Sequence, residues 1–465
     1  MIKTPVPTNN ILEGVRYEIR GELAARALEL ERKGYEIISL NIGNPGLFGF
    51  RTPETMRLAM IENLGQSEAY CHQKGVFPAR EAVVMQQQAR GVMDVTADDV
   101  FMGNGVSECI DLALRALLNS GDEVLVPSPD YPLWSASVAL NHGTPVYYNC
   151  LPENGFQPDP DEIRSLLTPR TRGIVVINPN NPTGAVYSRP LLEEIARIAE
   201  QNRIVVFSDE IYDEMLYGDA VHIPMATLVH DTLCASFNGL SKVYRACGYR
   251  VGWIAFSGDR ENASEYLHAV ELLASLRLCA NVPGQWAVQT ALGGYQSIKE
   301  LTSEGGRLFQ ARQAIIDGVD SSKFMSLTEP DGSMYAFPAI DTTLFEAFDD
   351  TFASEPEVWR PIFAALQSGD GAAGMGEVGD RVVQYVQDDF AKAAADGLFT
   401  VEPDLERFAR HVFVTRMSRL ERWAQGQIDW DVYRASSCLG LELSLAAVLC
   451  EPHRSDALER SRIAR

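Results

Sequence analysis

Lys242 stands in a sequence context that suits a reactive amine. In the segment SFNGLSKVYRACGYRVGW it follows a Gly-Leu-Ser turn, and its neighbours are mostly small or apolar. Such surroundings favour the neutral amine that attacks an aldehyde, whereas a lysine chosen at random is usually a solvated surface residue. Arg250, eight positions later, offers a planar charged fork for a phosphate, with the Ser241 hydroxyl as a neutral partner. The pattern predicts a reactive amine beside a phosphate site.

The segment MGNGVSECIDLAL contributes a second candidate for that phosphate site. A glycine turn precedes an amphipathic helix, so the backbone N–H groups of Gly105 and Val106 and the hydroxyl of Ser107 can face an anion at the helix start. A glycine turn alone is weak evidence. Here the glycine turn gains weight because it would bind a phosphate, the same group for which Arg250 is a candidate ligand.

Asp209 closes the apolar run IVVFSDE, where a buried strand is expected to end. Aspartate at such a position commonly caps a following helix. Open α/β sheets, however, also bind their ligands where the strands end. Taken alone, Asp209 favours the capping interpretation, and only the other motifs shift the balance.

Together these segments resemble the class I and II aminotransferases, which are fold-type I pyridoxal-phosphate enzymes. NPNNPTG is similar to the family's asparagine-proline-threonine-glycine turn, and SDEIYD to its strand end with aspartate and tyrosine. The resemblance implies that Lys242 holds pyridoxal 5′-phosphate as a Schiff base. It implies that Asp209 keeps the pyridine nitrogen protonated, which strengthens the ring as an electron acceptor. Asn181 and Tyr212 would contact the phenolic oxygen of the cofactor.

Two further tyrosines take roles from the same resemblance. PSPDYPLW matches the position where an aromatic ring stacks on the cofactor, here Tyr131, although a core tyrosine in a turn is the alternative. AYCHQKGVFPAREAV resembles the segment whose tyrosine, here Tyr70, reaches the phosphate of the neighbouring subunit. The family likeness thus implies a homodimer with shared active sites that uses amino acids and keto acids.

Within the family the chain is most similar to the alanine-forming transaminases. The likeness covers roughly residues 10–340 and is carried by YEIRGELAARALELERKGYEIISLNIGNPG, GNGVSE, NGLSKVYRACGYRVGW and LRLCANVPGQWAVQTALGGYQS. It implies a glycine-rich substrate loop around Gly43. Asn281 would either face the partner's active site or hold a structural position before Val282. The expected reaction is transamination of an alanine- or glutamate-like amino acid, with Lys242 moving the α-proton.

The C-terminal region departs from the family pattern. The family fixes the substrate α-carboxylate with an arginine on a strand of the small domain, because arginine pairs with carboxylates through two bonds. Arg434 in WDVYRASS lies 31 residues from the end, a family-like distance, while Arg416 in HVFVTRMS lies on the better alternating strand. Either can equally be a surface residue. The departure keeps a second function open: elimination, replacement or carbon-carbon bond formation on an amino acid such as S-adenosylmethionine.

Helical stretches alternate with short apolar runs along most of the chain. This alternation predicts an α/β fold, with a large domain built on a mostly parallel sheet flanked by helices and a smaller α+β domain. The strands are expected at 122–127, 173–178, 204–210 and 252–256, a helix at 13–33, a helical region from about 299, and a further strand at 331–340. The domains expected are 1–49 (N-terminal arm and part of the small domain), 50–325 (large cofactor-binding domain) and 326–465 (small domain, with a glycine-rich insertion at 367–380).

Charge and composition limit the partners. The 465 residues include 63 acidic and 40 basic ones, a net charge of -23, which disfavours nucleic acids and anionic membranes and favours a small-molecule ligand. The start, MIKTPVPTNN, lacks the features of a signal peptide, so we expect a cytoplasmic protein. Eight cysteines without a C-x-x-C pair and seven histidines without ligand spacing predict no metal site.

Overall fold

The computed structural model describes residues 6–15, 22–37, 43–322 and 325–340. The chain divides into two compact units, residues 1–340 and 341–465, and the second lies outside the described residues. The domain boundaries expected from the sequence, and the insertion at 367–380, therefore stay predictions. No helix in the described ranges is long and apolar enough to cross a membrane.

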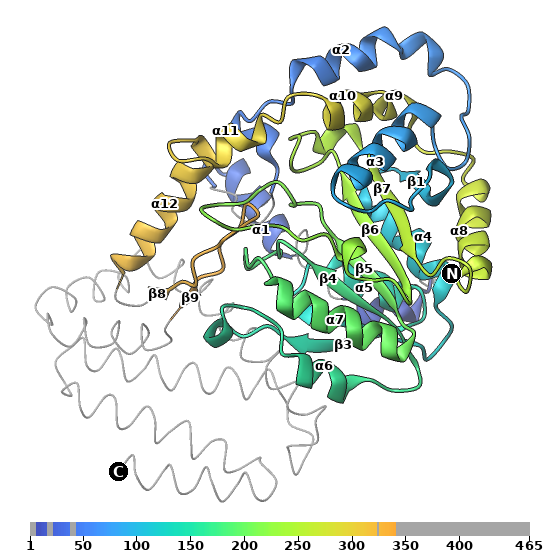
Figure 1. The fold of residues 1–465 in the computed structure, drawn as a ribbon. Coiled ribbons are helices and arrows are strands. Elements are labelled where there is room, and N and C mark those ends of the chain that lie inside the picture. The colour runs from blue at the N-terminus through green and yellow to red at the C-terminus, as the bar shows by residue number, and fades with distance from the viewer. Residues whose placement is uncertain (1–5, 16–21, 38–42, 323–324, 341–465) are drawn as a thin grey trace, which may run out of the picture. The chain divides into compact units, whose positions relative to one another are not determined.

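A seven-stranded sheet forms the centre of the described unit (Figure 1), in the order β1-β7-β6-β5-β4-β2-β3. Neighbouring strands from β6 to β3 are parallel, whereas β7 is antiparallel to both β6 and β1. The mostly parallel sheet is confirmed, and all four predicted strands are present. The strands are β1 (Val100–Gly103), β2 (Glu123–Ser128), β3 (Thr144–Asn149), β4 (Thr171–Ile177), β5 (Val205–Asp209), β6 (Leu233–Gly239) and β7 (Gly252–Gly258).

Helices cover both faces of this sheet, because its strands are apolar on both sides. In β4, Ile174 and Val176 belong to one buried cluster and Val175 and Ile177 to the other. The first cluster includes residues of α3, α7 and α10, and the second includes residues of α4, α5 and α8. The helices are α1 (Glu22–Arg32), α2 (Glu54–Glu62), α3 (Phe77–Ala89), α4 (Val106–Leu117), α5 (Leu133–Leu140), α6 (Pro160–Leu166), α7 (Arg189–Asn202), α8 (Ser264–Leu276), α9 (Val282–Gln285), α10 (Ala287–Gly293), α11 (Ile298–Thr302) and α12 (Arg307–Asp320).

The strand expected at 331–340 forms only at its end. Two short strands, β8 (Met325–Ser326) and β9 (Ala339–Ile340), pair antiparallel, and the residues between them are irregular. The backbone at the start of this stretch bonds to the large sheet's loops instead: Gly332 N–H donates to Gly184 O and Ser333 N–H to Met215 O. These long-range bonds replace the ladder that the sequence pattern predicts, and they bring Tyr335 to the candidate site.

Candidate active site

The residues singled out by the sequence gather at one edge of the sheet, where the parallel strands end. Asp209, the last residue of β5, lies in register between Ile177, the last residue of β4, and Phe237 of β6. The NPNNPTG turn follows β4 and the Gly-Leu-Ser-Lys turn follows β6. Since parallel strands end together, three segments far apart in sequence place their polar groups side by side.

Lys242 contacts the glycine-rich N-terminal segment. It is half-buried, and its Nζ donates a hydrogen bond to Gly43 O at 2.8 Å. A side chain at Gly43 is excluded, because a Cβ there would lie 2.6 Å from Met334 Sδ and 2.6 Å from Tyr335 Oη. The amine therefore meets the predicted substrate loop, and glycine at position 43 allows Met334 and Tyr335 to approach that loop closely.

Asp209 is a buried carboxylate whose partners within the chain are neutral. Trp134 Nε1 donates to its Oδ2 at 2.9 Å, and the Ile211 N–H lies 3.4 Å from its Oδ1. Burial raises the pKa of Asp209 to about 6, an effect that the Trp134 hydrogen bond and the charge of Lys242 only partly offset. No helix begins at Asp209, so the capping interpretation does not account for it. Such a carboxylate favours a cationic partner.

Tyr212 is linked to Gly43 through a residue that the sequence did not single out. Its hydroxyl donates to Tyr335 Oη at 3.1 Å, and the Gly43 N–H donates to the same oxygen at 3.3 Å. Burial and the neighbouring Tyr335 hydroxyl hold the pKa of Tyr212 well above its ordinary value, so this hydroxyl keeps its proton. Tyr335 sits in the SMYAF stretch, whose pattern shows a strand but gives no sign of a polar role.

In the asparagine turn after β4, the neighbouring residues Asn180 and Asn181 have different surroundings. Asn180 is buried, and its Oδ1 accepts from both the N–H and the hydroxyl of Thr183, at 3.2 and 2.8 Å. The turn is therefore held by Asn180, and the predicted ligand Asn181 is only half-buried beside it. Tyr131 is half-buried against the cluster that contains Trp134.

The predicted phosphate ligands come together at the start of α4. Gly105 precedes the helix with a φ of 84°, and a Cβ on it would lie 2.3 Å from Arg250 Nη2. A Cβ on Gly252 would lie 2.4 Å from Val106 N. The exposed Arg250 thus lies beside Gly105, the residue before α4. The half-buried Ser107 lies in the first turn of that helix, and Ser241 is also half-buried.

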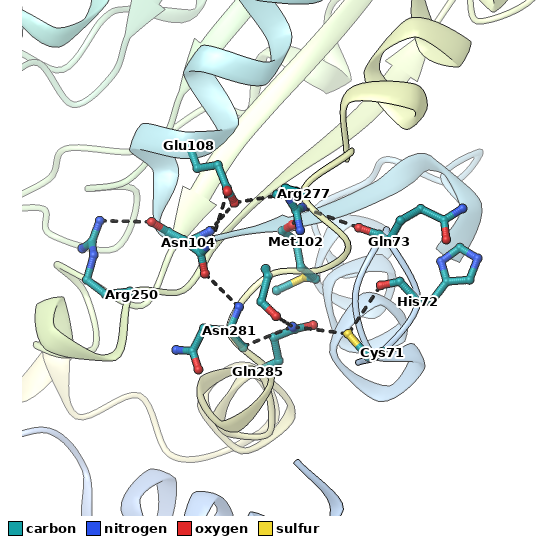
Figure 2. Close-up of polar contacts among 11 residues, drawn as sticks. Cys71, His72, Gln73, Met102, Asn104, Glu108, Arg250, Arg277, Asn281 and Gln285 are labelled. Atoms are coloured by element: carbon teal, nitrogen blue, oxygen red, sulfur yellow. Dashed lines mark hydrogen bonds and ion pairs between the residues drawn. The ribbon is translucent and has the colours of Figure 1, made fainter. Parts of the chain in front are cut away.

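A polar network behind this turn was not predicted (Figure 2). Glu108 accepts from Asn104 N at 2.7 Å and from its Nδ2 at 3.1 Å, and Arg277 Nε lies 3.4 Å from the same carboxylate. Arg277 Nη2 also donates to Met102 O at 2.6 Å, and Arg250 Nη2 to Asn104 O at 3.2 Å. The network fixes the residues just before the phosphate turn. The acidic residue in the first turn of α4, Glu108, is the one feature of the sequence that could have pointed to this network.

Asn281 has a structural role in this network. Its Oδ1 caps α9, its Nδ2 donates to Tyr249 O at 2.7 Å, and its N–H donates to Asn104 Oδ1 at 2.8 Å. Of the two interpretations left open by the sequence, the structural one therefore accounts for its contacts. Tyr70, by contrast, is 77% exposed. Arg416 and Arg434 lie outside the described residues. Among the described residues, no group of three or more side chains is placed to bind a metal ion.

Comparison with known proteins places this site in a family. The family model described as aminotransferase class I and II matches residues 35–365. The chain belongs to this family. The resemblance inferred from the sequence is confirmed, and the protein is a pyridoxal-phosphate-dependent aminotransferase.

Named relatives agree with this assignment. The aminotransferase is 50% identical over 347 residues to glutamate-pyruvate aminotransferase AlaA of Escherichia coli (strain K12), covering 75% of this chain and 86% of that protein. It is 47% identical over 340 residues to the alanine aminotransferase of Mycobacterium tuberculosis (strain ATCC 25618 / H37Rv), covering 73% and 79%. Because these relatives are named as aminotransferases, the elimination, replacement or bond-forming alternative is not favoured.

Solved structures show the same fold. A crystal structure of an aminotransferase from Escherichia coli matches with a TM-score of 0.73 at 49% identity, covering 75% of this chain and 87% of that one. The alanine aminotransferase from Pyrococcus furiosus matches with a TM-score of 0.68 at 38% identity, covering 72% and 85%. The fold-type I architecture of the aminotransferase is therefore confirmed.

The geometry of the aminotransferase fits pyridoxal phosphate at both ends. At one end, Gly105 leaves room for Arg250, and Gly252 leaves room for the Val106 N–H at the start of α4, which suits a phosphate. At the other, the buried Asp209 has only neutral hydrogen-bond donors, which suits a protonated ring nitrogen. Lys242 reaches the same strand edge. The residues present fit the cofactor that the family uses.

Proposed function

We propose that this chain transfers the amino group of an alanine- or glutamate-like amino acid to a keto acid, with Lys242 as the covalent lysine and proton-transfer base. The observation that carries the proposal is the half-buried Lys242 amine, which hydrogen-bonds Gly43 O at the strand edge that ends in Asp209. The names of the relatives in Escherichia coli and Mycobacterium tuberculosis support the substrate class.

Each described residue has a chemical task in this proposal. Bound pyridoxal phosphate supplies a ring that withdraws electrons from the substrate α-carbon. Asp209 keeps the ring nitrogen protonated, and Trp134 holds that carboxylate in place. Lys242 Nζ removes the α-proton as a general base. Arg250 and the N–H groups at the start of α4 bind phosphate, assisted by the Ser107 and Ser241 hydroxyls in this proposal.

The remaining predicted ligands complete the proposal. Asn181 and Tyr212 would contact the phenolic oxygen, and Tyr131 would stack on the ring. The buried, protonated Tyr212 hydroxyl is suited to donate a hydrogen bond there. The substrate α-carboxylate would pair with an arginine of the C-terminal region, Arg434 or Arg416. Replacing each with methionine and comparing KM for the amino acid distinguishes the two.

The half-reaction tests the proposal. Purified holoenzyme is mixed with L-alanine without a keto acid, and pyruvate and cofactor absorbance are measured. We expect one pyruvate per active site, with conversion of the cofactor to its amine form. Continuous product release with the aldehyde form retained would indicate elimination or replacement chemistry instead.

Replacing the lysine tests its assignment directly. Lys242→Ala should lose both the absorbance of the lysine-linked cofactor and the half-reaction, because no other amine occupies its place in this proposal. Lys299→Ala is the matched control, since Lys299 is an exposed lysine on α11. Survival of the lysine-linked absorbance in Lys242→Ala would overturn the assignment.

A homodimer with shared active sites is part of the proposal. Tyr70, proposed to reach the partner's phosphate, is 77% exposed in the single chain, and Leu276 at the end of α8 is 74% exposed. Mixing Lys242→Ala with Tyr70→Ala subunits should restore about a quarter of wild-type activity, because half of the dimers are hybrids with one intact site. No recovery after confirmed subunit exchange would contradict shared sites.

A cytoplasmic location is proposed on the cysteines. The six cysteines in the described ranges are free thiols, as expected in a reducing compartment. Fractionation of cells that produce the protein, with thiol labelling of each fraction, tests this. Recovery in an oxidising compartment would refute it.

A further inference from the structure

The hydroxyl of Tyr335 joins the predicted substrate loop to the residue that is proposed to contact the cofactor's phenolic oxygen. Its Oη accepts from the Gly43 N–H at 3.3 Å, and the Tyr212 hydroxyl lies 3.1 Å from it. The carbonyl of Gly43 in turn accepts the Lys242 Nζ hydrogen bond at 2.8 Å. A continuous line of polar groups therefore runs from the reactive amine to Tyr212, and the proposed function gives its middle member, Tyr335, no task.

The backbone around Tyr335 is bonded to both loops that carry candidate cofactor ligands. Gly332 N–H donates to Gly184 O at 2.8 Å, in the turn after β4, and Ser333 N–H donates to Met215 O at 2.9 Å, in the loop after β5. The packing at Gly184 is close, because a Cβ there would lie 3.0 Å from Tyr335 O. These contacts hold Tyr335 at a fixed place between the two loops.

The rings of Tyr212 and Tyr335 pack edge to face. Their centroids are 5.7 Å apart and their planes differ by 78°, an arrangement that aromatic pairs favour. Tyr212 is buried and Tyr335 is half-buried. The hydrogen bond between the two hydroxyls therefore lies mostly away from solvent, where neighbouring hydrogen bonds polarise one another.

A count of protons fixes the direction of this bond once Tyr212 has a second acceptor. A tyrosine hydroxyl donates one proton and can also accept. In the structure the Tyr212 hydroxyl donates to Tyr335. If Tyr212 donates to the phenolic oxygen instead, the bond between the hydroxyls persists only when Tyr335 is the donor. The Gly43 N–H donates to Tyr335 Oη and leaves the Tyr335 proton free for this.

We propose that Tyr335 is a positioning residue, which donates its proton to Tyr212 when the cofactor is bound and so directs the Tyr212 proton to the phenolic oxygen. The inference rests on the proposed function. Each hydrogen bond of the line strengthens the next one, so Tyr212 becomes a stronger donor and stabilises an anionic phenolic oxygen. Loss of the proton from the lysine-linked nitrogen leaves that anion uncompensated. The stronger donor therefore lowers the pKa of this nitrogen.

A pH titration of the holoenzyme tests the proposal, because the absorbance of the lysine-linked cofactor depends on the protonation of that nitrogen. Tyr335→Phe keeps the ring, removes the hydroxyl and should raise the pKa of the nitrogen by about 0.3 to 0.6 unit. Tyr212→Phe removes the donor itself and should raise it by about 1 to 2 units. An unchanged pKa in Tyr335→Phe would overturn the proposal. A lowered pKa would do so too, because Tyr335 would then compete for the Tyr212 proton.

Tyr217→Phe is the matched control. Tyr217 is also buried, and its hydroxyl donates to Ser333 O at 3.0 Å, so the variant removes a hydroxyl that is bonded to the same stretch as Tyr335. The pKa of the lysine-linked nitrogen should not change in this variant. A rise equal to that in Tyr335→Phe would overturn the proposal, because loosening of the stretch would then explain both. Asp209 and Tyr131 also face Tyr212, and every variant keeps them.

The double variant Tyr212→Phe/Tyr335→Phe shows whether Tyr335 acts through Tyr212. We expect the pKa of Tyr212→Phe alone, and shifts that add would overturn the proposal. If Tyr212→Phe raises the pKa but Tyr335→Phe does not, this inference alone fails. If Tyr212→Phe causes no rise, its proposed contact with the phenolic oxygen fails as well. The titration uses no amino acid, so its result is independent of the half-reaction that tests transamination.

Discussion

Asp209 makes the stability of the aminotransferase depend on pH, and the isosteric variant Asp209→Asn should lack this dependence. The carboxylate is buried, and burial raises its pKa from 3.8 to about 6. Between these two values the folded chain holds a proton that the unfolded chain has lost. Stability must therefore fall as the pH rises through this window, and it stays lower at higher pH. Asp209→Asn keeps the shape and the oxygen that accepts from Trp134 but cannot ionise.

The size of the effect follows from the pKa difference. A shift from 3.8 to about 6 corresponds to about 3 kcal/mol at pH 8, of which about 2 kcal/mol develops between pH 4.5 and pH 8. Urea unfolding of the cofactor-free wild type and Asp209→Asn at both pH values measures it. We expect the variant's advantage to grow by about 2 kcal/mol, while the holoenzyme variant loses transaminase activity.

The control is the difference between two pH values, since any fixed effect of the substitution cancels in it. Other titrating groups are common to both proteins and cancel as well. An advantage for Asp209→Asn that stays constant, or shrinks, between pH 4.5 and pH 8 would show that Asp209 is not an uncompensated buried acid.

Three more substitutions test contacts that the structure reveals. Arg277→Met removes the cation that pairs with Glu108 and should weaken cofactor binding about tenfold, as measured by fluorescence titration. Arg277→Lys should recover part of this loss. Unchanged cofactor binding in Arg277→Met would refute the role of the network. Arg90→Met leaves the buried Asp213, 2.6 Å from Arg90 Nη1, without its cation and should lower the free energy of unfolding by about 3 to 5 kcal/mol, which urea titration measures. Arg307→Met removes the hydrogen bond to Phe48 O and the contact with the Phe50 ring, and it should lower the free energy of unfolding by about 1 kcal/mol in urea titration. Unchanged stability would contradict the contribution of these contacts.

The sequence predicts what depends on local pattern. The runs that became β2, β4, β5 and β7 are apolar on both faces, and this pattern alone indicates buried strands of an α/β sheet. Asp209 and Arg250 could be singled out from the sequence because each directly adjoins a recognisable turn. The direction of β7 was not predictable, since an apolar run looks the same in a parallel and an antiparallel neighbour.

The rest depends on contacts between distant segments. Trp134 and Asp209 are 75 positions apart, and Tyr212 and Tyr335 are 123 apart. Nothing in the local surroundings of Trp134 or Tyr335 distinguishes a tryptophan or tyrosine with a buried polar partner from an ordinary core residue. The strand expected at 331–340 was mostly wrong for the same reason, because its backbone partners are loops from elsewhere in the chain.

The neutral surroundings of Asp209 connect folding to cofactor binding. Trp134 and the Ile211 N–H hold the carboxylate but carry no charge, so the cost of burying an ionised acid remains in the cofactor-free protein. A protonated ring nitrogen beside Asp209 removes that cost, and the free energy recovered adds to cofactor affinity. Binding should therefore flatten the pH dependence of stability. The same carboxylate that destabilises the empty fold is the group that selects a cationic ring, so Asp209→Asn should stabilise the cofactor-free protein and weaken its hold on the cofactor together.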